Sequence, residues 1–271
     1  MAEPASRNSV FLFVENTGRV FSRAVEEAGY LFSLLVESLF WILCGPFYRQ
    51  PVRSPAIFSQ MMSIGIAAAP IVFILSFAVG IMLAIQIIYN LRIFGAESQV
   101  VGGVALSVTR EFGPLITSIL IAGRSGSALA ARIGTMQVNQ EVDALRVMGI
   151  NPVRYLVSPA LLAMLIMLPT LTFFSDLAGM LGGAVYTSLE IGLGIEAYVF
   201  QTLEILTMDD IYQGLIKSLV FAVIISLIGV SNGFMVSGGA EGVGKATTRS
   251  VVLSISYIVV ADMIFTYFLN R

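Results

Sequence analysis

Long apolar stretches alternate along the chain with short segments that carry most of its charges. No charged residue lies between Ser54 and Leu91, and a helix of about 20 mainly apolar residues is long enough to cross a bilayer. We therefore predict a first membrane span near 62–90. The same criterion predicts four further spans, near 98–123, 155–185, 218–236 and 250–269.

A shorter apolar stretch, Tyr30–Cys44, precedes the first span and contains Glu37. This length is typical of a re-entrant or interfacial segment and not of a span. The sequence thus divides into an N-terminal interfacial segment, 1–53, and a transmembrane domain, 54–271.

The residues before this stretch have the pattern of an amphipathic helix. Opposite charges stand four residues apart at Glu15 and Arg19 and again at Arg23 and Glu27, a spacing that places each pair on one helix face. Apolar residues recur at helical spacing on another face. A helix on the membrane surface is favoured, and a helix packed on the bundle is the alternative.

Composition supports an all-α integral membrane protein. The chain is 57% hydrophobic and 12% charged, whereas soluble domains carry about 25% charged residues. It has no His and a single Cys, Cys44, which excludes histidine catalysis, histidine metal sites and an intrachain disulfide. The net charge of −2 does not suggest a nucleic-acid partner.

The distribution of basic residues predicts the orientation. Most of the fifteen Lys and Arg residues stand before the first span, between spans two and three, or between spans four and five. Basic loops stay in the cytoplasm, so we expect five spans with a cytoplasmic N-terminus and an external C-terminus. The first residues lack the pattern of a cleavable signal peptide. The external side receives an acidic run and three basic residues, Arg92, Lys217 and Arg271.

Residues 239–246, GAEGVGKA, nearly match the phosphate-binding loop of ATPases. That motif needs Ser or Thr after its Lys, because the hydroxyl binds magnesium, and here Ala246 follows Lys245. The segment also lies between two predicted spans. We interpret it as a glycine-rich cytoplasmic turn and expect ATP and magnesium to bind to another chain.

A charged pair stands inside the second predicted span, in the sequence Arg110-Glu111-Phe112-Gly113-Pro114. Arg110 precedes Arg124, the expected cytoplasmic end of the span, by fourteen residues, or about 21 Å of helix. Charges at such depth face a cavity or a partner. Because Pro114 has no N–H, the carbonyl of Arg110 loses its helical hydrogen bond. The pair either lines a substrate cavity or forms an internal ion pair that ties helices together.

The segment Thr135–Gly149 predicts a short cytoplasmic helix between two spans. Its apolar residues follow helical spacing, and Gly149 with the following Asn151-Pro152 forms a stop signal. Such a helix docks into a groove on a partner protein or lies on lipid.

Small and acidic residues inside the spans leave further alternatives open. Gly179 and Gly183 form a pair that allows close helix packing, within the chain or between two copies. Asp176 and Asp262 are intramembrane carboxylates that pair with polar groups or, together with Glu111, relay protons in a secondary transporter. An intramembrane enzyme would need a nucleophile, base or metal set that the chain does not offer.

Several separate motifs occur in order at the spacing of a known family. They are Arg110-Glu-Phe-Gly-Pro114, Ala122-Gly-Arg-Ser-Gly-Ser-Ala128, Ala131-Arg-Ile-Gly134, Gln140-Glu-Val-Asp-Ala-Leu145, Met148-Gly-Ile-Asn-Pro152 and Ala246-Thr-Thr-Arg-Ser-Val-Val252. From about residue 50 to its end the chain resembles the MlaE/YrbE permease family, the membrane subunits of bacterial ABC transporters that move lipids together with MCE-domain proteins.

The resemblance implies a homodimer of permeases in the bacterial inner membrane that maintains outer-membrane lipid asymmetry. It also implies a cytoplasmic ABC ATPase of the MlaF type, which holds ATP and magnesium, a STAS-domain protein of the MlaB type bound to that ATPase, and a periplasmic MCE-domain ring of the MlaD type. A phospholipid would occupy an outward-facing cavity at the dimer interface.

Matching positions imply the site residues. The cavity would be lined by Leu83, Leu91, Phe94, Arg110 and Glu111. The coupling helix, which contacts the ATPase, maps onto Asn139–Met148, with Gln140, Glu141, Asp143, Ala144 and Leu145.

The chain departs from the family pattern at three places. Gln140 stands where members often carry an acid, Pro159-Ala160 where they often have Pro-Arg, and Asn90 where the residue can be apolar. These differences bear on the charge contribution to ATPase docking and on head-group selectivity.

Overall fold

The computed structural model describes residues 9–48 and 50–269, and the regular structure in these ranges is helical. The α-helices are α1 (Ser9–Cys44), α2 (Ser54–Met61), α3 (Ala69–Arg92), α4 (Val100–Ser107), α5 (Gly113–Ile121), α6 (Ser127–Val138), α7 (Glu141–Val147), α8 (Ser158–Ile191), α9 (Ile195–Ile205), α10 (Met208–Phe234) and α11 (Gly239–Leu269). Four π-helical turns, Met62–Ile66, Val108–Phe112, Ala122–Gly126 and Val153–Val157, and one 3-10 turn, Glu97–Gln99, lie between some of them.

Six helical stretches of the described chain are long and apolar enough to cross a membrane, so this is a multi-pass membrane protein. They are Val25–Cys44, Ser54–Arg92, Glu97–Val138, Val153–Ile191, Met208–Phe234 and Gly239–Leu269. Four of them contain the predicted spans near 62–90, 98–123, 155–185 and 250–269, and Met208–Phe234 covers the span predicted near 218–236 except for its last two residues. Most of these helices are longer than the predicted spans, because polar residues at their ends continue the helix but do not belong to the apolar stretch.

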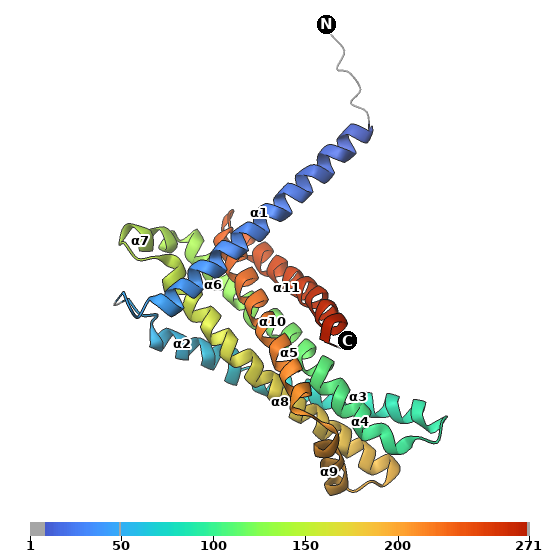
Figure 1. The fold of residues 1–271 in the computed structure, drawn as a ribbon. Helices are drawn as coiled ribbons and strands as arrows, with labels where there is room; N and C mark the ends of the chain where they lie inside the picture. Colours follow the sequence, from blue (N-terminus) through green and yellow to red (C-terminus); the bar gives the residue numbers. More distant parts are fainter. Residues whose placement is uncertain (1–8, 49, 270–271) are drawn as a thin grey trace.

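The two ends of the bundle contain different chain connections (Figure 1). The chain turns at one end, here called the α7 end, before α2, around α7 and between α10 and α11. It turns at the other, called the α9 end, between α3 and α4 and around α9.

Helix α1 runs across the bundle at the α7 end (Figure 1). Leu34 is buried against a cluster that includes Val157 and Val230, and the side-chain amide of Asn151 donates to Glu37 at 2.7 Å. These partners all lie near the α7 end, so the contacts of Val25–Cys44 fit an interfacial position although its length would allow a span. The predicted amphipathic pattern rests largely on Glu15, Arg19 and Arg23, and the positions of these side chains lie outside the described residues.

Close contact between α3 and α8 forms the middle of the bundle. A Cβ atom added at Gly80 would lie 1.9 Å from the carbonyl oxygen of Gly179, and one at Gly182 would lie 2.1 Å from that of Phe77. Gly179 and Gly183 are both buried here, so this small-residue pair serves packing within the chain and not between copies. Only glycine allows the two backbones to approach so closely.

We expect Gly182→Ala to destabilise the bundle, because the added methyl group must push α3 away from α8. Overpacking of this kind costs about 1–3 kcal/mol. Thermal unfolding of the detergent-solubilised protein, followed by size-exclusion chromatography, would measure the loss. Gly244→Ala is the matched control, since a Cβ atom there has no neighbour within 4 Å. Equal stability of the two variants would contradict the packing argument.

Candidate functional site

Arg110 and Glu111 lie on a π-helical turn, Val108–Phe112, in the middle of the second predicted span. Pro114 interrupts the α-helical hydrogen-bond ladder because it has no N–H to donate. The N–H of Gly113 bonds instead to the carbonyl oxygen of Val108, five residues earlier. Such turns are frequent at functional sites, where they change the direction in which side chains project.

Arg110 pairs with the first turn of α10. Its Nε donates to Asp210 Oδ1 at 2.6 Å, and its Nη2 lies 2.5 Å from the same oxygen. The other oxygen of Asp210 accepts from the N–H and the hydroxyl of Thr207 at 2.8 Å each, which completes a capping box at the start of α10. The Asp210 side chain is buried, whereas 37% of the Arg110 side chain is exposed.

Glu111 belongs to a separate cluster around Lys217 of α10. The Lys217 ammonium donates to Glu111 Oε2 at 2.7 Å and to the Thr266 hydroxyl at 3.1 Å, and it lies 3.0 Å from Asp262 Oδ1. The Thr266 hydroxyl lies 3.0 Å from Glu111 Oε1. The cluster therefore joins the π turn to α10 and α11, with Lys217 buried and 30% of the Glu111 side chain exposed.

The sequence-based placement of Lys217 outside the membrane was wrong. Lys217 stands nine residues into α10, about 14 Å from its start at Met208. Two carboxylates offset the cost of burying its charge, which a hydropathy window cannot register. A signal was present: Asp210, Gly214 and Lys217 are spaced by four and three residues, so they share one helix face.

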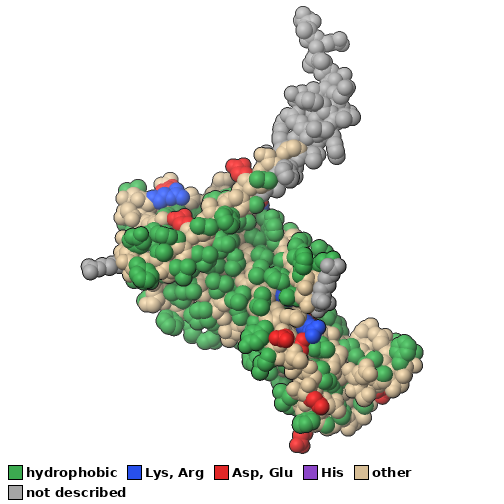
Figure 2. Space-filling model, viewed as in Figure 1, with side chains coloured by type: hydrophobic (Ala, Val, Ile, Leu, Met, Phe, Trp, Pro, Cys, Tyr) green, Lys and Arg blue, Asp and Glu red, His purple; other side chains and the backbone are tan. Residues whose placement is uncertain are grey.

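The cluster lies near the end of α11, where the surface steps inward. In Figure 1, α11 ends beside α10 and α5, while α3, α4 and α9 continue beyond it. Figure 2 shows charged side chains of both signs gathered just beyond the end of α11. The part-exposed sides of Arg110 and Glu111 are thus accessible from outside the single chain.

The three apolar residues expected in the cavity lie along or directly after α3. Leu83 packs against a cluster that includes Val108, which belongs to the same π turn as Arg110. Leu91 packs on a cluster that includes Val100, and Phe94, in the turn after α3, is 80% exposed. The structure therefore brings Leu83 close to the charged turn and places the other two nearer the α9 end.

The expected coupling helix is shorter than the segment Thr135–Gly149. Residues 135–138 complete α6, and a turn with Gln140 in the left-handed conformation (φ 59°) separates them from α7. Gln140, Glu141, Asp143 and Ala144 are exposed. Leu145 is buried with Val142 against Leu156, so it anchors α7 to the bundle and is not on the accessible face.

The remaining sequence features differ in how they relate to this site. Asp176 is buried, and its Oδ1 occupies the space where a Cβ atom of Gly113 would lie, whereas Asp262 is paired with Lys217. Residues 239–246 form the first turns of α11 and not a loop, so the predicted turn is limited to the residues before Gly239. Among the described residues, no group of three or more acidic, Cys or His side chains could hold a metal ion.

We expect Lys217→Met to destabilise the protein by about 3 kcal/mol, because it leaves two carboxylates without their buried partner. Thermal unfolding in detergent would measure this loss. Adding Glu111→Gln and Asp262→Asn to the same chain should restore much of the stability. Lys245→Met, which removes an exposed i,i+4 pair with Glu241, should cost less than about 1 kcal/mol. An equal effect of Lys217→Met and Lys245→Met would contradict the cluster.

Most of the chain is similar to known proteins. The family described as Permease MlaE matches residues 57–268. A probable ABC transporter permease protein of Rickettsia prowazekii is 36% identical over 235 residues, covering 86% of this chain and 91% of the relative. The protein TRIGALACTOSYLDIACYLGLYCEROL 1, chloroplastic, of Arabidopsis thaliana is 40% identical over 190 residues, covering 70% and 54%.

A third relative is the intermembrane phospholipid transport system permease protein MlaE of Haemophilus influenzae, 32% identical over 254 residues, covering 91% of this chain and 92% of the relative. The family match covers far more than half of the sequence and includes the charged π turn and α7. The chain therefore belongs to the MlaE permease family, as a membrane permease subunit of an ABC transporter.

Proposed function

We propose that two copies of this chain form the membrane part of an ATP-driven phospholipid transporter, with the lipid bound in a cavity beside Arg110 and Glu111. The observation that carries the proposal is the part-exposed charge cluster within the membrane spans. A charge at this depth normally faces a cavity or a partner. Arg110 and Glu111 are each held by a buried partner, yet each keeps an exposed side.

The chemistry of the cluster suits a phospholipid. The accessible part of the Arg110 guanidinium can donate to a phosphate, while Leu83, Leu91 and Phe94 offer apolar surface to acyl chains along and after α3. A second copy would close the open side into a cavity. The name of the Haemophilus influenzae relative, an intermembrane phospholipid transport system permease, supports this substrate class.

The charges at the two ends support a cytoplasmic α7 end. Basic residues gather there, namely Arg53, Arg132, Arg146, Arg154, Lys245 and Arg249. The α9 end carries Arg92 together with five acidic residues, Glu97, Glu190, Glu196, Glu204 and Asp209. Because basic loops stay inside, we place the N-terminus in the cytoplasm and the C-terminus in the periplasm of a double-membraned bacterium, with five spans and α1 at the inner surface.

Helix α7 is the proposed contact for an ATPase of the MlaF type. Its exposed face carries Glu141 and Asp143, and Val147 is 89% exposed. Its buried face packs on a cluster that includes Phe234, the last residue of α10. Lys217 and Phe234 both belong to α10. A displacement of α7 can therefore be transmitted to the charge cluster through α10.

The further partners follow from this arrangement. An MCE-domain ring of the MlaD type would contact the α9 end, and a STAS-domain protein of the MlaB type would bind the ATPase and not this chain. The assembly would maintain the lipid asymmetry of the outer membrane.

We expect Arg110→Ala and Glu111→Ala each to lower ATP-dependent lipid transfer by about tenfold or more, because a hydrogen bond to a charged group contributes about 1.5–3 kcal/mol. Transfer would be measured with the complete complex in proteoliposomes, and barrier function by detergent resistance of cells. Arg92→Ala, which removes two exposed charge pairs at the α9 end, is the control. Wild-type transfer by both cluster variants would rule out the site, and transfer without ATP would favour a proton-coupled carrier.

We expect the double variant Glu141→Lys/Asp143→Lys to reduce co-purification of the ATPase by about tenfold, because reversing charges on an interface removes complementary contacts and adds repulsion. Glu196→Lys/Glu204→Lys makes the same charge change at the α9 end and should leave ATPase recovery unchanged. Both side chains on α7 are exposed, so thermal stability should be retained. Full ATPase recovery with the α7 variant would show that the ATPase binds to another part of the permease.

A further inference from the structure

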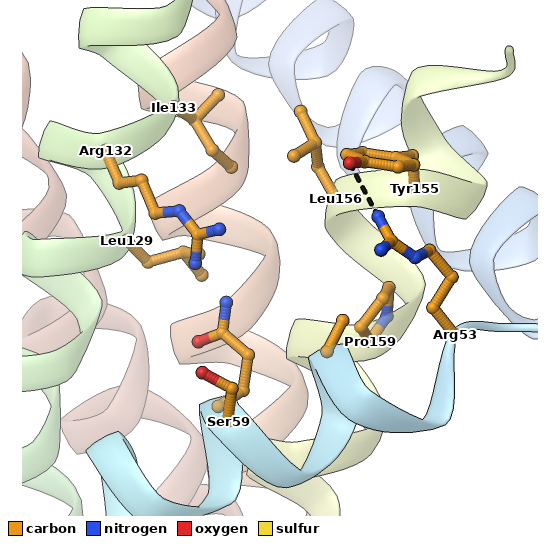
Figure 3. Close-up of a pocket in the computed structure, with 10 residues that line it drawn as sticks. Arg53, Ser59, Leu129, Arg132, Ile133, Tyr155, Leu156 and Pro159 are labelled. Atoms are coloured by element: carbon orange, nitrogen blue, oxygen red, sulfur yellow. Dashed lines mark hydrogen bonds between the residues drawn. The ribbon is translucent and has the colours of Figure 1, made fainter.

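A pocket lined by arginine lies between α2, α6 and the start of α8 (Figure 3), and none of its lining residues belongs to the charge cluster. It consists of two adjoining hollows of about 80 and 150 Å³, both open to the surroundings, which share Gln60, Leu129 and Arg132. In Figure 3, Arg132 projects from α6 and Arg53 from the segment before α2, on opposite sides of one hollow. Arg124 lines the other. We call the two hollows together the arginine pocket.

The guanidinium groups of this pocket have no carboxylate partner among the described residues. Arg53 donates to the Tyr155 hydroxyl at 2.6 Å, and its guanidinium lies 5.0 Å from the centre of the Tyr155 ring. Arg124 donates to the carbonyl oxygen of Ser63 at 3.2 Å. Arg132 is exposed. The residues lining both hollows include no Asp or Glu but add neutral donors from Ser59, Gln60, Ser63 and Ser125.

The level of the pocket along the bundle corresponds to a membrane surface. Arg124 lies about 21 Å of helix from Arg110, and Arg132 about 12 Å further. The hydrocarbon core is about 30 Å thick. With Arg124 at the boundary of the α7 end, Arg110 lies about 9 Å inside the opposite boundary and Arg132 lies outside the core, so the guanidinium groups of Arg124 and Arg132 are at the depth of lipid head groups.

We propose that the arginine pocket binds the phosphate of an anionic membrane phospholipid, as a site separate from the transport cavity. Arginine forks and hydroxyl groups are suited to phosphate oxygens, and basic pockets between membrane helices bind anionic head groups. A lipid is favoured over free phosphate because Phe58, Met62 and Ile66 form an exposed apolar row at four-residue spacing, directly beside Ser59 and Ser63 in sequence. Acyl chains can lie on this row while the phosphate occupies the pocket.

The bound lipid would connect α2 with α6 through charge. The direct contact of Arg124 with the π turn after α2 is a hydrogen bond to the backbone carbonyl of Ser63, whereas an anionic phosphate in the hollow between Arg53 and Arg132 would offset the repulsion between these two like charges. The permease would therefore be more stable in an anionic membrane than in a zwitterionic one. This consequence does not depend on which lipid is transported.

The test is equilibrium binding of radiolabelled phosphatidylglycerol to the full-length protein in a neutral detergent, in a Glu111→Ala background that weakens the transport site. We expect Arg132→Gln to lower the apparent affinity about tenfold, and Arg132→Lys, which keeps the charge without the fork, to give an intermediate loss. Lys245→Gln removes the same charge at the same end, from a side chain that is 78% exposed, and should bind as the parent does. Phosphatidylcholine and millimolar inorganic phosphate should compete weakly.

Three results would overturn the proposal. Unchanged affinity of both Arg132→Gln and Arg53→Gln/Arg132→Gln would show that the pocket binds no lipid. Competition by inorganic phosphate as strong as that by phosphatidylglycerol would assign the pocket to a free anion. Unchanged lipid affinity combined with loss of the second copy or of the ATPase would assign the arginines to carboxylates of a partner protein. Arg132 is exposed and has no ion pair among the described residues, so its variants should fold.

Discussion

The ammonium group of Lys217 holds three membrane segments together through charge. It reaches Glu111 on the π turn and Asp262 on α11 from its own position on α10, in surroundings where an unpaired charge would be very costly. The pairing fixes how deep these segments sit relative to one another. It also holds Glu111 in a position where 30% of its side chain stays exposed.

The backbone beside this cluster departs from the α-helical pattern at the π turn Val108–Phe112. Pro114 breaks the α-helical ladder, and the resulting π turn directs two consecutive charged residues to different partners, Arg110 to Asp210 and Glu111 to Lys217. Both partners lie on α10, so one rigid helix receives both charges. The other end of α10 packs near α7. A motion at the α7 end therefore has a continuous physical route to the charged turn.

The two ends of the bundle are different chemical environments. The α7 end combines the exposed Glu141 and Asp143 of α7 with arginines that have no carboxylate partner among the described residues. The α9 end is mainly acidic and includes the ion pairs of Arg92 with Glu97 and Glu190. This polarity is the basis of the distinct contacts that we propose for the two ends.

The sequence by itself determined the membrane class, five of the apolar spans, the special character of the Arg110–Pro114 motif and the existence of a helix near 141–147, because hydropathy, proline and charge are local properties. Tertiary structure alone decided which charges meet. Lys217 lies more than a hundred residues from Glu111 in the chain, and its burial depends on carboxylates that no local window contains. Three further features depend on how the helices pack, which brings together residues that are distant in the sequence. They are the packing of Gly179 and Gly183 within the chain, the burial of Leu145 and the position of Arg53 and Arg132 on opposite sides of one hollow.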